Sequence, residues 1–262
     1  KIVTLALEAG EIAARAFTTK NFSVTKKADG SGVTSADIAV SKFLREHLGN
    51  EFPAIPIICE EGELREVSGE VFFLIDPIDG TLGYIDYANS GFDQDLGPEK
   101  DFCLLLGIVE NGQPRFGAVY NYVTKERIFI DAEDRNHFER INNKRNYSQE
   151  YAVYLDQRAA EDPLTKELLV MPDVAIIKQA ALGLKSVYTI INPHQEAVTV
   201  HKVQTAGLWD ILPAAAAAKI FGGGVYDDTG KPLRLNRYII LPGKGATIIK
   251  GDKFNFVIDK LK

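Results

Sequence analysis

Residues 76–81 read Asp-Pro-Ile-Asp-Gly-Thr and directly follow the apolar run VFFLI. Asp-Pro and Asp-Gly are common turn dipeptides, so an ordinary turn is one interpretation of this stretch. The same residues could also bind a cation, because the ring of Pro77 fixes φ and tightens the turn. Asp76 and Asp79 can then face the same side of the turn, with the Ile78 carbonyl between them.

A helix that begins directly after this turn would add a site for an anion. The backbone amides of Gly80 and Thr81 would point from the start of that helix toward a bound anion such as a phosphate. The stretch therefore combines candidate cation ligands with candidate phosphate donors.

Three further acidic residues lie at the ends of expected elements. Glu60 closes the apolar strand IPIIC, Asp37 lies in the first turn of a helix, and Asp210 begins an alanine-rich helix. Each has an ordinary alternative as a solvated strand end, a helix-dipole residue or a first-turn cap. Mg²⁺, however, binds through several carboxylate oxygens that converge from separate elements. Glu60, Asp76, Asp79 and Asp210 could supply such a set.

Two other interpretations of the motif are excluded by counting residues. An EF-hand loop with Gly80 at its sixth position would need ligands at Ile75 and Pro77 and a glutamate in place of Asp86. An aspartyl-phosphate phosphatase would need its nucleophile two residues before Asp79, where Pro77 stands. Attack by water, assisted by a metal, remains as the chemistry.

The composition limits the partners. The chain has 262 residues, 45% hydrophobic and 25% charged, which is typical of a soluble globular protein of one large or two small domains. Its net charge of -6 argues against binding to nucleic acid polymers or anionic membranes. Cys59 and Cys103 lie in apolar stretches, which argues against a disulfide scaffold or a cysteine zinc site and favours a cytoplasmic protein. No apolar run reaches the roughly 18 residues of a membrane span.

The periodicity of apolar residues predicts the elements that position these carboxylates. Helices are expected over residues 2–17, amphipathic rather than a secretion signal, and 35–48. The strands between residues 54 and 131, with a hairpin at Asn111-Gly112, predict a largely antiparallel sheet. The second half alternates strands and helices: strands at 173–178, 197–202, 238–243 and 246–251, and helices at 165–171, 181–191 and 208–221. The polar stretch 132–160 predicts a junction between subdomains of residues 1–145, with most of the metal ligands, and 146–262, with Asp210 and substrate contacts.

Four motifs in order along the chain resemble those of the inositol monophosphatase family. They are VTSAD (33–37), CEEGE (59–63), DPIDGT (76–81) and GLWDILPAAAAAKIFGGGVYDDTGKPL (207–233). The family comprises lithium-sensitive, magnesium-dependent phosphomonoesterases and includes inositol monophosphatase and 3'(2'),5'-bisphosphate nucleotidase. The resemblance implies a mixed α/β fold, a layered αβαβα sandwich like that of fructose-1,6-bisphosphatase, with the site where two subdomains meet.

The resemblance also implies the roles of individual residues. Two to three Mg²⁺ ions would be held by Glu60, Asp76, the Ile78 carbonyl, Asp79 and Asp210. Asp37 and Thr81 would form the pair that activates the attacking water. A threonine hydroxyl alone is too weak a base, but a hydroxyl bonded to a carboxylate can accept a proton from water whose pKa a metal has lowered.

The choice of substrate depends on charge. Inositol monophosphatases carry a glutamate seven residues before the aspartate of the Trp-Asp pair, and here Val203 takes that place. Lys202 stands where the bisphosphate nucleotidases tend to have a cation, and Lys185 matches a lysine of theirs. Two lysines suit a second phosphate, so we expect adenosine 3',5'-bisphosphate (PAP) as the substrate, with inositol 1-phosphate as the alternative. Both lysines could instead be solvated surface residues.

The sequence departs from the family pattern in two places. The segment after Thr81 continues for longer than usual, and its acidic residues 93, 95, 99 and 101 either shape substrate entry or belong to a solvated loop. Ala181-Leu182 replaces a Gly-Ser pair before the substrate-binding helix. A catalytically inactive sensor is disfavoured because every carboxylate and the Asp37-Thr81 pair are present. The sequence leaves open whether the protein is a monomer or a homodimer.

Overall fold

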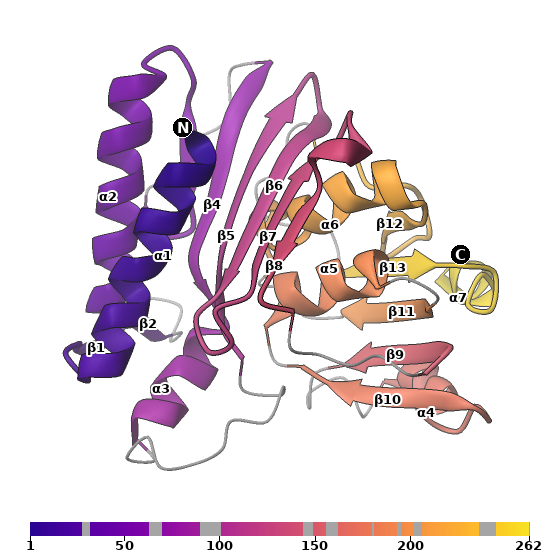
Figure 1. Cartoon of the computed structure of the whole chain (residues 1–262). Coiled ribbons are helices and arrows are strands. Elements are labelled where there is room, and N and C mark those ends of the chain that lie inside the picture. The colour runs from indigo at the N-terminus through magenta and orange to yellow at the C-terminus, as the bar shows by residue number, and fades with distance from the viewer. Residues whose placement is uncertain are drawn as a thin grey trace.

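Two large β-sheets alternate with layers of helices (Figure 1). The computed structural model describes residues 1–27, 32–62, 70–89, 101–143, 149–155, 162–179, 181–192, 195–201, 206–235 and 245–261. The helices are α1 (Ile2–Thr19), α2 (Ser35–Glu51), α3 (Thr81–Asn89), α4 (Pro163–Leu169), α5 (Leu182–Ile191), α6 (Leu208–Phe221), α7 (Phe256–Leu261) and the 3₁₀ turn η2 (Arg135–His137). A small antiparallel pair, β1 (Val24–Lys26) and β2 (Gly32–Thr34), precedes α2.

The first large sheet has six strands in the order β3-β4-β5-β6-β7-β8. The strands are β3 (Ile57–Cys59), β4 (Val71–Asp79), β5 (Cys103–Glu110), β6 (Gln113–Asn121), β7 (Arg127–Asp131) and β8 (Glu139–Ile141). Only the β3–β4 pair is parallel, which confirms the predicted antiparallel sheet. The β5–β6 hairpin turns at Asn111 and Gly112, whose φ angles of 52° and 72° fit the twist of the flanking strands.

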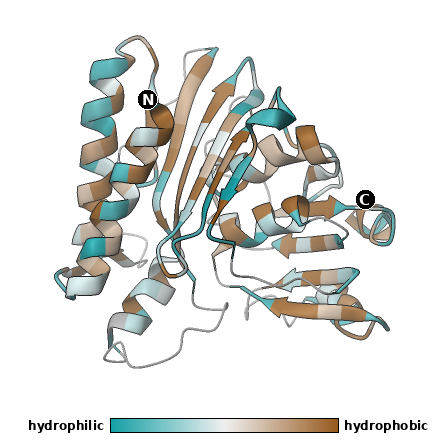
Figure 2. Cartoon of the chain, viewed as in Figure 1, coloured by the Kyte–Doolittle hydropathy of each residue, from teal (hydrophilic) through white to brown (hydrophobic). Residues whose placement is uncertain are grey.

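Helices cover both faces of this sheet, and β4 between them is hydrophobic over most of its length (Figure 2). Phe73 and Ile75 pack against α1 and α2, whereas Phe72 and Leu74 pack against α5 and α6. Successive side chains of a strand point to opposite faces, so a run that is apolar throughout belongs in a sheet buried on both sides. The VFFLI run of the sequence has this pattern because β4 lies between two helical layers.

The second sheet has five strands in the order β10-β9-β11-β13-β12. The strands are β9 (Tyr151–Leu155), β10 (Val174–Lys178), β11 (Glu196–His201), β12 (Gly224–Asp227) and β13 (Ala246–Lys250). Because β9, β10 and β11 are parallel, their carboxyl ends lie at one edge of the sheet. Helices α5 and α6 cover one face, and α4 packs with α7 and Phe254 in the core on the other. The layers therefore follow the predicted αβαβα order.

Helix α6 lies unusually close to the first sheet. Gly107 and Gly117 face each other across β5 and β6, directly beneath this helix. A Cβ atom on Gly107 would lie 2.3 Å from Leu212 Cδ2, and one on Gly117 would lie 2.8 Å from Pro213 Cα. The two glycines and the alanines of α6 thus let the helix fit between two sheets.

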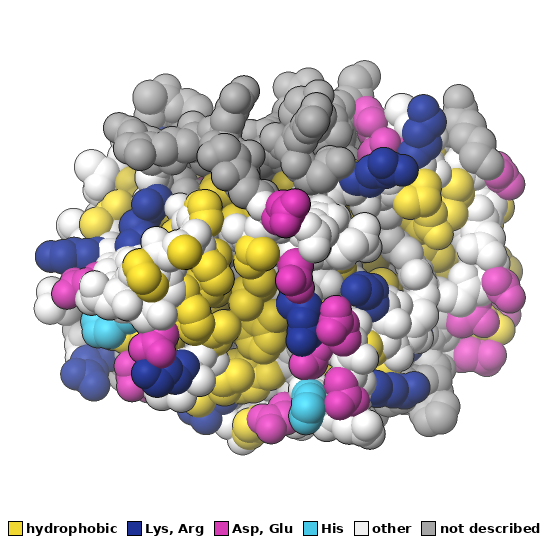
Figure 3. All heavy atoms as spheres, turned by 90° about the horizontal axis from the view of Figure 1, so that it is seen from above, with side chains coloured by type: hydrophobic (Ala, Val, Ile, Leu, Met, Phe, Trp, Pro, Cys, Tyr) yellow, Lys and Arg dark blue, Asp and Glu magenta, His cyan; other side chains and the backbone are white. Residues whose placement is uncertain are grey.

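Several other expectations can be compared with the structure. The predicted helices and the strands at 173–178, 197–201 and 246–250 are present, whereas residues 238–243 and the predicted boundary near residue 145 lie outside the described residues. The division into two subdomains stays a prediction. No helix of the described residues is long and apolar enough to cross a membrane. On the face seen from above, the described acidic and basic side chains are intermingled (Figure 3).

A buried polar network joins the first sheet to α5 and the second sheet. Glu126, whose side chain is 1% exposed, accepts hydrogen bonds from Arg140 Nε at 2.6 Å and from the Tyr188 hydroxyl at 2.5 Å. Arg140 also donates to Asn192 Oδ1 at 3.2 Å, and Asn192 Nδ2 donates to the Tyr154 hydroxyl. The carboxylate of Glu126 thus has a charged partner although it is shielded from water.

Arg140→Leu should lower the free energy of unfolding by about 3 kcal/mol, because it leaves the buried Glu126 carboxylate without its charged partner. Denaturant unfolding measures this change. Arg115→Leu is the matched control, since it removes an arginine whose side chain is 36% exposed and should cost less than about 1 kcal/mol. Equal effects of the two variants would contradict a role of the network in stability.

Candidate active site

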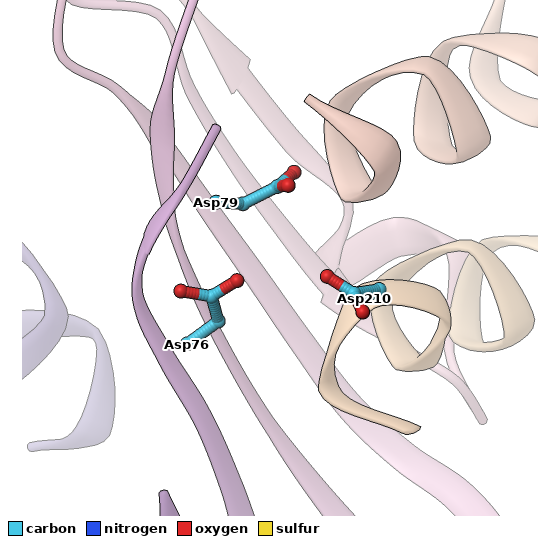
Figure 4. Close-up of side chains that lie close together, drawn as sticks. All are labelled: Asp76, Asp79 and Asp210. Carbon is cyan, nitrogen blue, oxygen red and sulfur yellow. The ribbon is translucent and has the colours of Figure 1, made fainter. Parts of the chain in front are cut away.

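Three aspartates converge where the two sheets meet the starts of helices. Asp76 and Asp79 extend from the end of β4, and Asp210 extends from the first turn of α6 into the same space (Figure 4). One carboxylate oxygen of each lies within 4.8 Å of the others. The side chains are buried, with 2%, 5% and 7% exposure. The structure thus brings together residues that are up to 134 positions apart, 210 minus 76.

An irregularity in β4 places Asp76 and Asp79 on the same face. Residues three apart in a regular strand point to opposite faces. Here Asp76 pairs with Leu105 and Asp79 with Cys103, so β4 uses three steps where β5 uses two. Such a bulge restores both carboxylates to the face that Leu105 and Cys103 share, which packs against α5 and α6. The backbone N–H of Ile78 donates to Asp76 Oδ1 at 2.9 Å and fixes the turn.

The start of α5 holds Asp79. The backbone N–H groups of Leu182, Gly183 and Leu184 donate to its carboxylate at 3.0, 2.7 and 3.3 Å. A Cβ atom at position 183 would lie 2.2 Å from Leu105 Cδ1 and 3.0 Å from Asp79 Oδ2. Only glycine therefore lets these amides approach the carboxylate so closely. The Ala-Leu substitution at 181–182 leaves the helix start intact, because the amides rather than the side chains make these contacts.

Asp210 and Asp37 occupy equivalent positions in two helices. The backbone N–H of Gly207 donates to Asp210 Oδ2 at 2.7 Å, and that of Thr34 donates to Asp37 Oδ2 at 2.8 Å. Each aspartate is the third residue of its helix, where a carboxylate stabilises the first turn. Both therefore cap a first turn, which fits the cap considered from the sequence for Asp210 and adds to the helix-dipole role considered for Asp37.

The surroundings disfavour the charged forms of the three clustered aspartates. Burial raises the pKa values of Asp76 and Asp210 well above the usual value, and nearby carboxylates raise them further. Burial also raises the pKa of Asp79, to about 6, although the α5 amides and the charge of Lys185 oppose the shift. A cation bound among them would favour all three charged forms. The donors are oxygens, which suits Mg²⁺, and burial keeps the pKa of the neighbouring Cys103 thiol well above its usual range.

Glu60 lies beside the cluster but is also held by a lysine. Its charge and hydrogen bond are among the causes that raise the pKa of Asp76. Lys27 Nζ lies 3.0 Å from Glu60 Oε1 and 2.5 Å from Glu61 Oε1. Lys27 was not predicted from the sequence, and no spacing rule indicates it, because the lysine precedes Glu60 by 33 residues.

Asp37 and Thr81 lie together as expected, with an additional contact to Ile78. The Thr81 hydroxyl oxygen is 3.4 Å from Asp37 Oδ1 and 2.8 Å from the Ile78 carbonyl oxygen. A hydroxyl has one proton, so the shorter distance indicates that it donates to Ile78 here. Burial raises the pKa of Asp37 to about 7, although the Thr34 hydroxyl, at 2.5 Å from Oδ2, and amide oppose the shift.

One acidic residue of the segment after Thr81 is buried. Asp101 is not part of a solvated loop: it is buried and accepts a hydrogen bond from Asn121 Nδ2 at 2.8 Å. Its carbonyl oxygen lies next to Gly80, whose φ of 89° carries the chain into α3. Residues 93, 95, 99, 202 and 203 lie outside the described residues.

Lys185 is not a surface lysine. It is 0% exposed, its Nζ donates to the Gln179 carbonyl oxygen at 3.4 Å, and its charge opposes the raised pKa values of Asp79 and Asp210. The solvated alternative is therefore wrong for Lys185. A lysine is rarely buried without a role for its charge.

The sequence is similar to one known protein family over most of its length. Residues 2–248 match the model of the inositol monophosphatase family. The chain belongs to this family. Family membership and the buried carboxylates together show a metal-dependent phosphomonoesterase. Both the predicted family and the predicted fold are confirmed.

Two relatives within this family are about equally similar to the chain. The 3'(2'),5'-bisphosphate nucleotidase CysQ of Escherichia coli K12 is 26% identical over 241 residues, which cover 89% of this chain and 92% of that protein. Inositol monophosphatase 2 of Homo sapiens is 25% identical over 245 residues, which cover 89% of this chain and 81% of that protein. Overall identity therefore does not decide between the two named activities.

Solved structures of the family have the same fold. The IMPase of Thermotoga maritima superposes with a TM-score of 0.71 at 20% identity, covering 99% of this chain and 94% of that one. An IMPase/NADP phosphatase complexed with Mg²⁺ and phosphate gives 0.73 at 16% identity, covering 98% and 92%. At these identities the likeness supports the fold alone.

Asp76→Asn should raise the melting temperature in EDTA and abolish most of the stabilisation by Mg²⁺. The substitution removes one of several buried like charges, which should contribute about 1 kcal/mol or roughly 2–4 °C. Wild-type protein should gain about 2.7 kcal/mol at a Mg²⁺ concentration of 100 times Kd. Thermal unfolding with and without Mg²⁺ measures both effects.

Asp173→Asn is the control for this experiment, because Asp173 is exposed and precedes the amino end of β10, the end of the strand away from the start of α5. Asp173→Asn should have the melting temperature of the wild type both in EDTA and with Mg²⁺. A response of Asp76→Asn to Mg²⁺ as large as that of the wild type would show that the cluster does not hold the ion.

Proposed function

We propose that the protein hydrolyses the 3'-phosphate of PAP to give AMP and phosphate. The observation that carries this proposal is the burial of Lys185 beside Asp79 and Asp210. A cation there can make a charge-assisted contact with a second phosphate, which PAP has and inositol 1-phosphate lacks. The apolar Val203, in place of a glutamate that would bind a sugar hydroxyl, supports the same choice.

The clustered carboxylates would hold the metal in this reaction. Asp76, Asp79 and Asp210, with Glu60 and the Ile78 carbonyl, supply oxygen ligands only. Mg²⁺ bound there would lower the pKa of the attacking water and neutralise charge on the phosphoryl group. The start of α3 would orient the phosphate through backbone amides.

Asp37 and Thr81 would accept the proton of the attacking water. The Thr81 hydroxyl can take this proton on Oγ1 if it passes its own proton to Asp37 Oδ1, 3.4 Å away. A carboxylate whose pKa lies near 7 is a stronger base than an ordinary aspartate, and it is still ionised in part at neutral pH. If a ligand bound the Ile78 carbonyl oxygen, the Thr81 hydroxyl could donate its hydrogen bond to Asp37 instead.

Inositol 1-phosphate hydrolysis is the second candidate. This candidate is retained because the two relatives are about equally identical to the chain, at 26% and 25%. The metal ligands and the Asp37-Thr81 pair would act in the same way on either substrate. A comparison of phosphate release from the two substrates at one Mg²⁺ concentration separates the candidates.

Asp37→Asn should lower kcat by about 10² or more with little change in KM, because the amide cannot accept the proton. Steady-state phosphate release measures both constants. Thr81→Ser, which keeps a hydroxyl, should lose much less activity than Thr81→Val. A kcat of Asp37→Asn near that of the wild type would refute the assignment of the base.

The kcat/KM for PAP should exceed that for inositol 1-phosphate by at least about tenfold, and Lys185→Met should narrow this ratio by removing the charge-assisted contact. Lys178→Met is the control, because Lys178 is an exposed lysine at the end of β10. It should leave the ratio unchanged. Equal or reversed values of kcat/KM for the wild type would favour the second candidate.

A further inference from the structure

Gln179 is a buried residue whose side chain makes no hydrogen bond to the described part of the chain. It is 0% exposed, and neither Oε1 nor Nε2 has a partner among the described residues. An unpaired amide in a protein interior costs roughly 1–3 kcal/mol. Buried polar groups are paired in the great majority of cases, so this exception suggests that the amide serves a ligand.

Gln179 lies at the carboxyl edge of the second sheet, beneath the start of α5. Its backbone N–H donates to the Leu155 carbonyl at 2.8 Å, which continues the pairing of β10 with β9. Ile177, two residues earlier, packs against the core around α5 and α6, so Gln179 faces the same side by alternation. In open α/β sheets, ligands bind in the crevice outside such carboxyl ends.

Lys185 connects Gln179 to the clustered aspartates. Its Nζ donates to the Gln179 carbonyl oxygen, and its charge acts on Asp79 and Asp210. The α5 amides that hold Asp79 begin three residues after Gln179. The position is thus next to the candidate metal centre, on the α5 side.

Gln179 lies on the α5 side of the candidate metal centre. This position determines which part of the substrate Gln179 can contact. Asp37 belongs to α2, which packs on one face of the first sheet, and α5 packs on the other face. In an in-line displacement, the attacking water and the leaving oxygen are on opposite sides of the phosphorus. With Asp37 at the water, the α5 side belongs to the leaving alcohol.

We propose that the Gln179 carboxamide binds the leaving alcohol of the substrate and helps to determine specificity, an inference that rests on the proposed phosphatase function. A carboxamide presents a donor and an acceptor next to each other. Its partner should have the complementary pair, which the edge of a purine base or two neighbouring ring hydroxyls can supply. A nitrophenyl group has no such pair.

Gln179→Leu tests the proposal with PAP, inositol 1-phosphate and 4-nitrophenyl phosphate at one Mg²⁺ concentration. The kcat/KM should fall about tenfold for the ester whose alcohol the amide binds and stay unchanged for 4-nitrophenyl phosphate. A loss confined to PAP identifies a base edge, and a loss confined to inositol 1-phosphate identifies ring hydroxyls. The melting temperature should stay the same or rise, since no hydrogen bond within the protein is lost.

Gln195→Leu is the matched control. Gln195 is also buried, but its Oε1 accepts from the Tyr154 hydroxyl at 3.0 Å and its Nε2 donates to the Gln149 carbonyl at 3.1 Å. This variant should lower the melting temperature and leave the ratios between substrates unchanged. Gln179→Leu would overturn the proposal if it lowered kcat/KM equally for all three esters or for none, or if it lowered the melting temperature as Gln195→Leu does.

A binding measurement separates this proposal from the proposed function. AMP and inositol are titrated by calorimetry into the wild type and Gln179→Leu, and the variant should bind one of the two alcohols about tenfold more weakly. Equal binding of both would overturn the role of Gln179 even in an active phosphatase. Absence of phosphate release by the wild type from every ester would instead refute the proposed function.

Discussion

Repulsion between carboxylates that are held close together and away from water is the constraint on which the rest of the structure depends. Burial raises the pKa values of Asp76, Asp79 and Asp210, Asp79 and Asp210 also raise that of Asp76, and Asp79 raises that of Asp210. A fold that buries such a group must supply compensating positive charge or dipoles. Here the compensation comes from the starts of helices and from Lys185, and a bound cation would add to it.

The layered arrangement explains how helix starts reach the carboxylates. Helices α5 and α6 lie between two sheets, so their first turns are held from both sides (Figure 1). The amides of α5 bind Asp79, and the first turn of α6 carries Asp210. Gly107, Gly117 and Gly183 permit close packing at three points of this layer, where a Cβ atom would collide with a neighbour. The glycines are therefore a structural requirement of the site as much as the aspartates are.

The sequence predicted the features that depend on local chemistry. The periodicity of apolar residues and the Asn-Gly turn predicted the helices and most of the strands, and the four motifs in order predicted the layered fold and the family. The bulge between Asp76 and Asp79 was not predicted, because it follows from the pairing of β4 with β5. The contacts of Lys27 with Glu60 and the burial of Lys185 and Asp101 also depend on residues far away in the chain. Local patterns contain no signal for such contacts.

The two sides of the site differ in how strongly charge and packing restrict which residues can occupy them. On the metal side, replacing one carboxylate changes the charge that a cation must balance, so the ligand set and its supporting amides can vary little. On the α5 side, the amides of residues 182–184 make their contacts whatever the side chains are, provided that position 183 has no Cβ atom. The Gln179 side chain, by contrast, makes no contact that holds Asp79, so its identity is not fixed by the metal chemistry. Since overall identity is about equal to a bisphosphate nucleotidase and to an inositol monophosphatase, and both would use the same metal chemistry, specificity should be sought in the side chains beside α5.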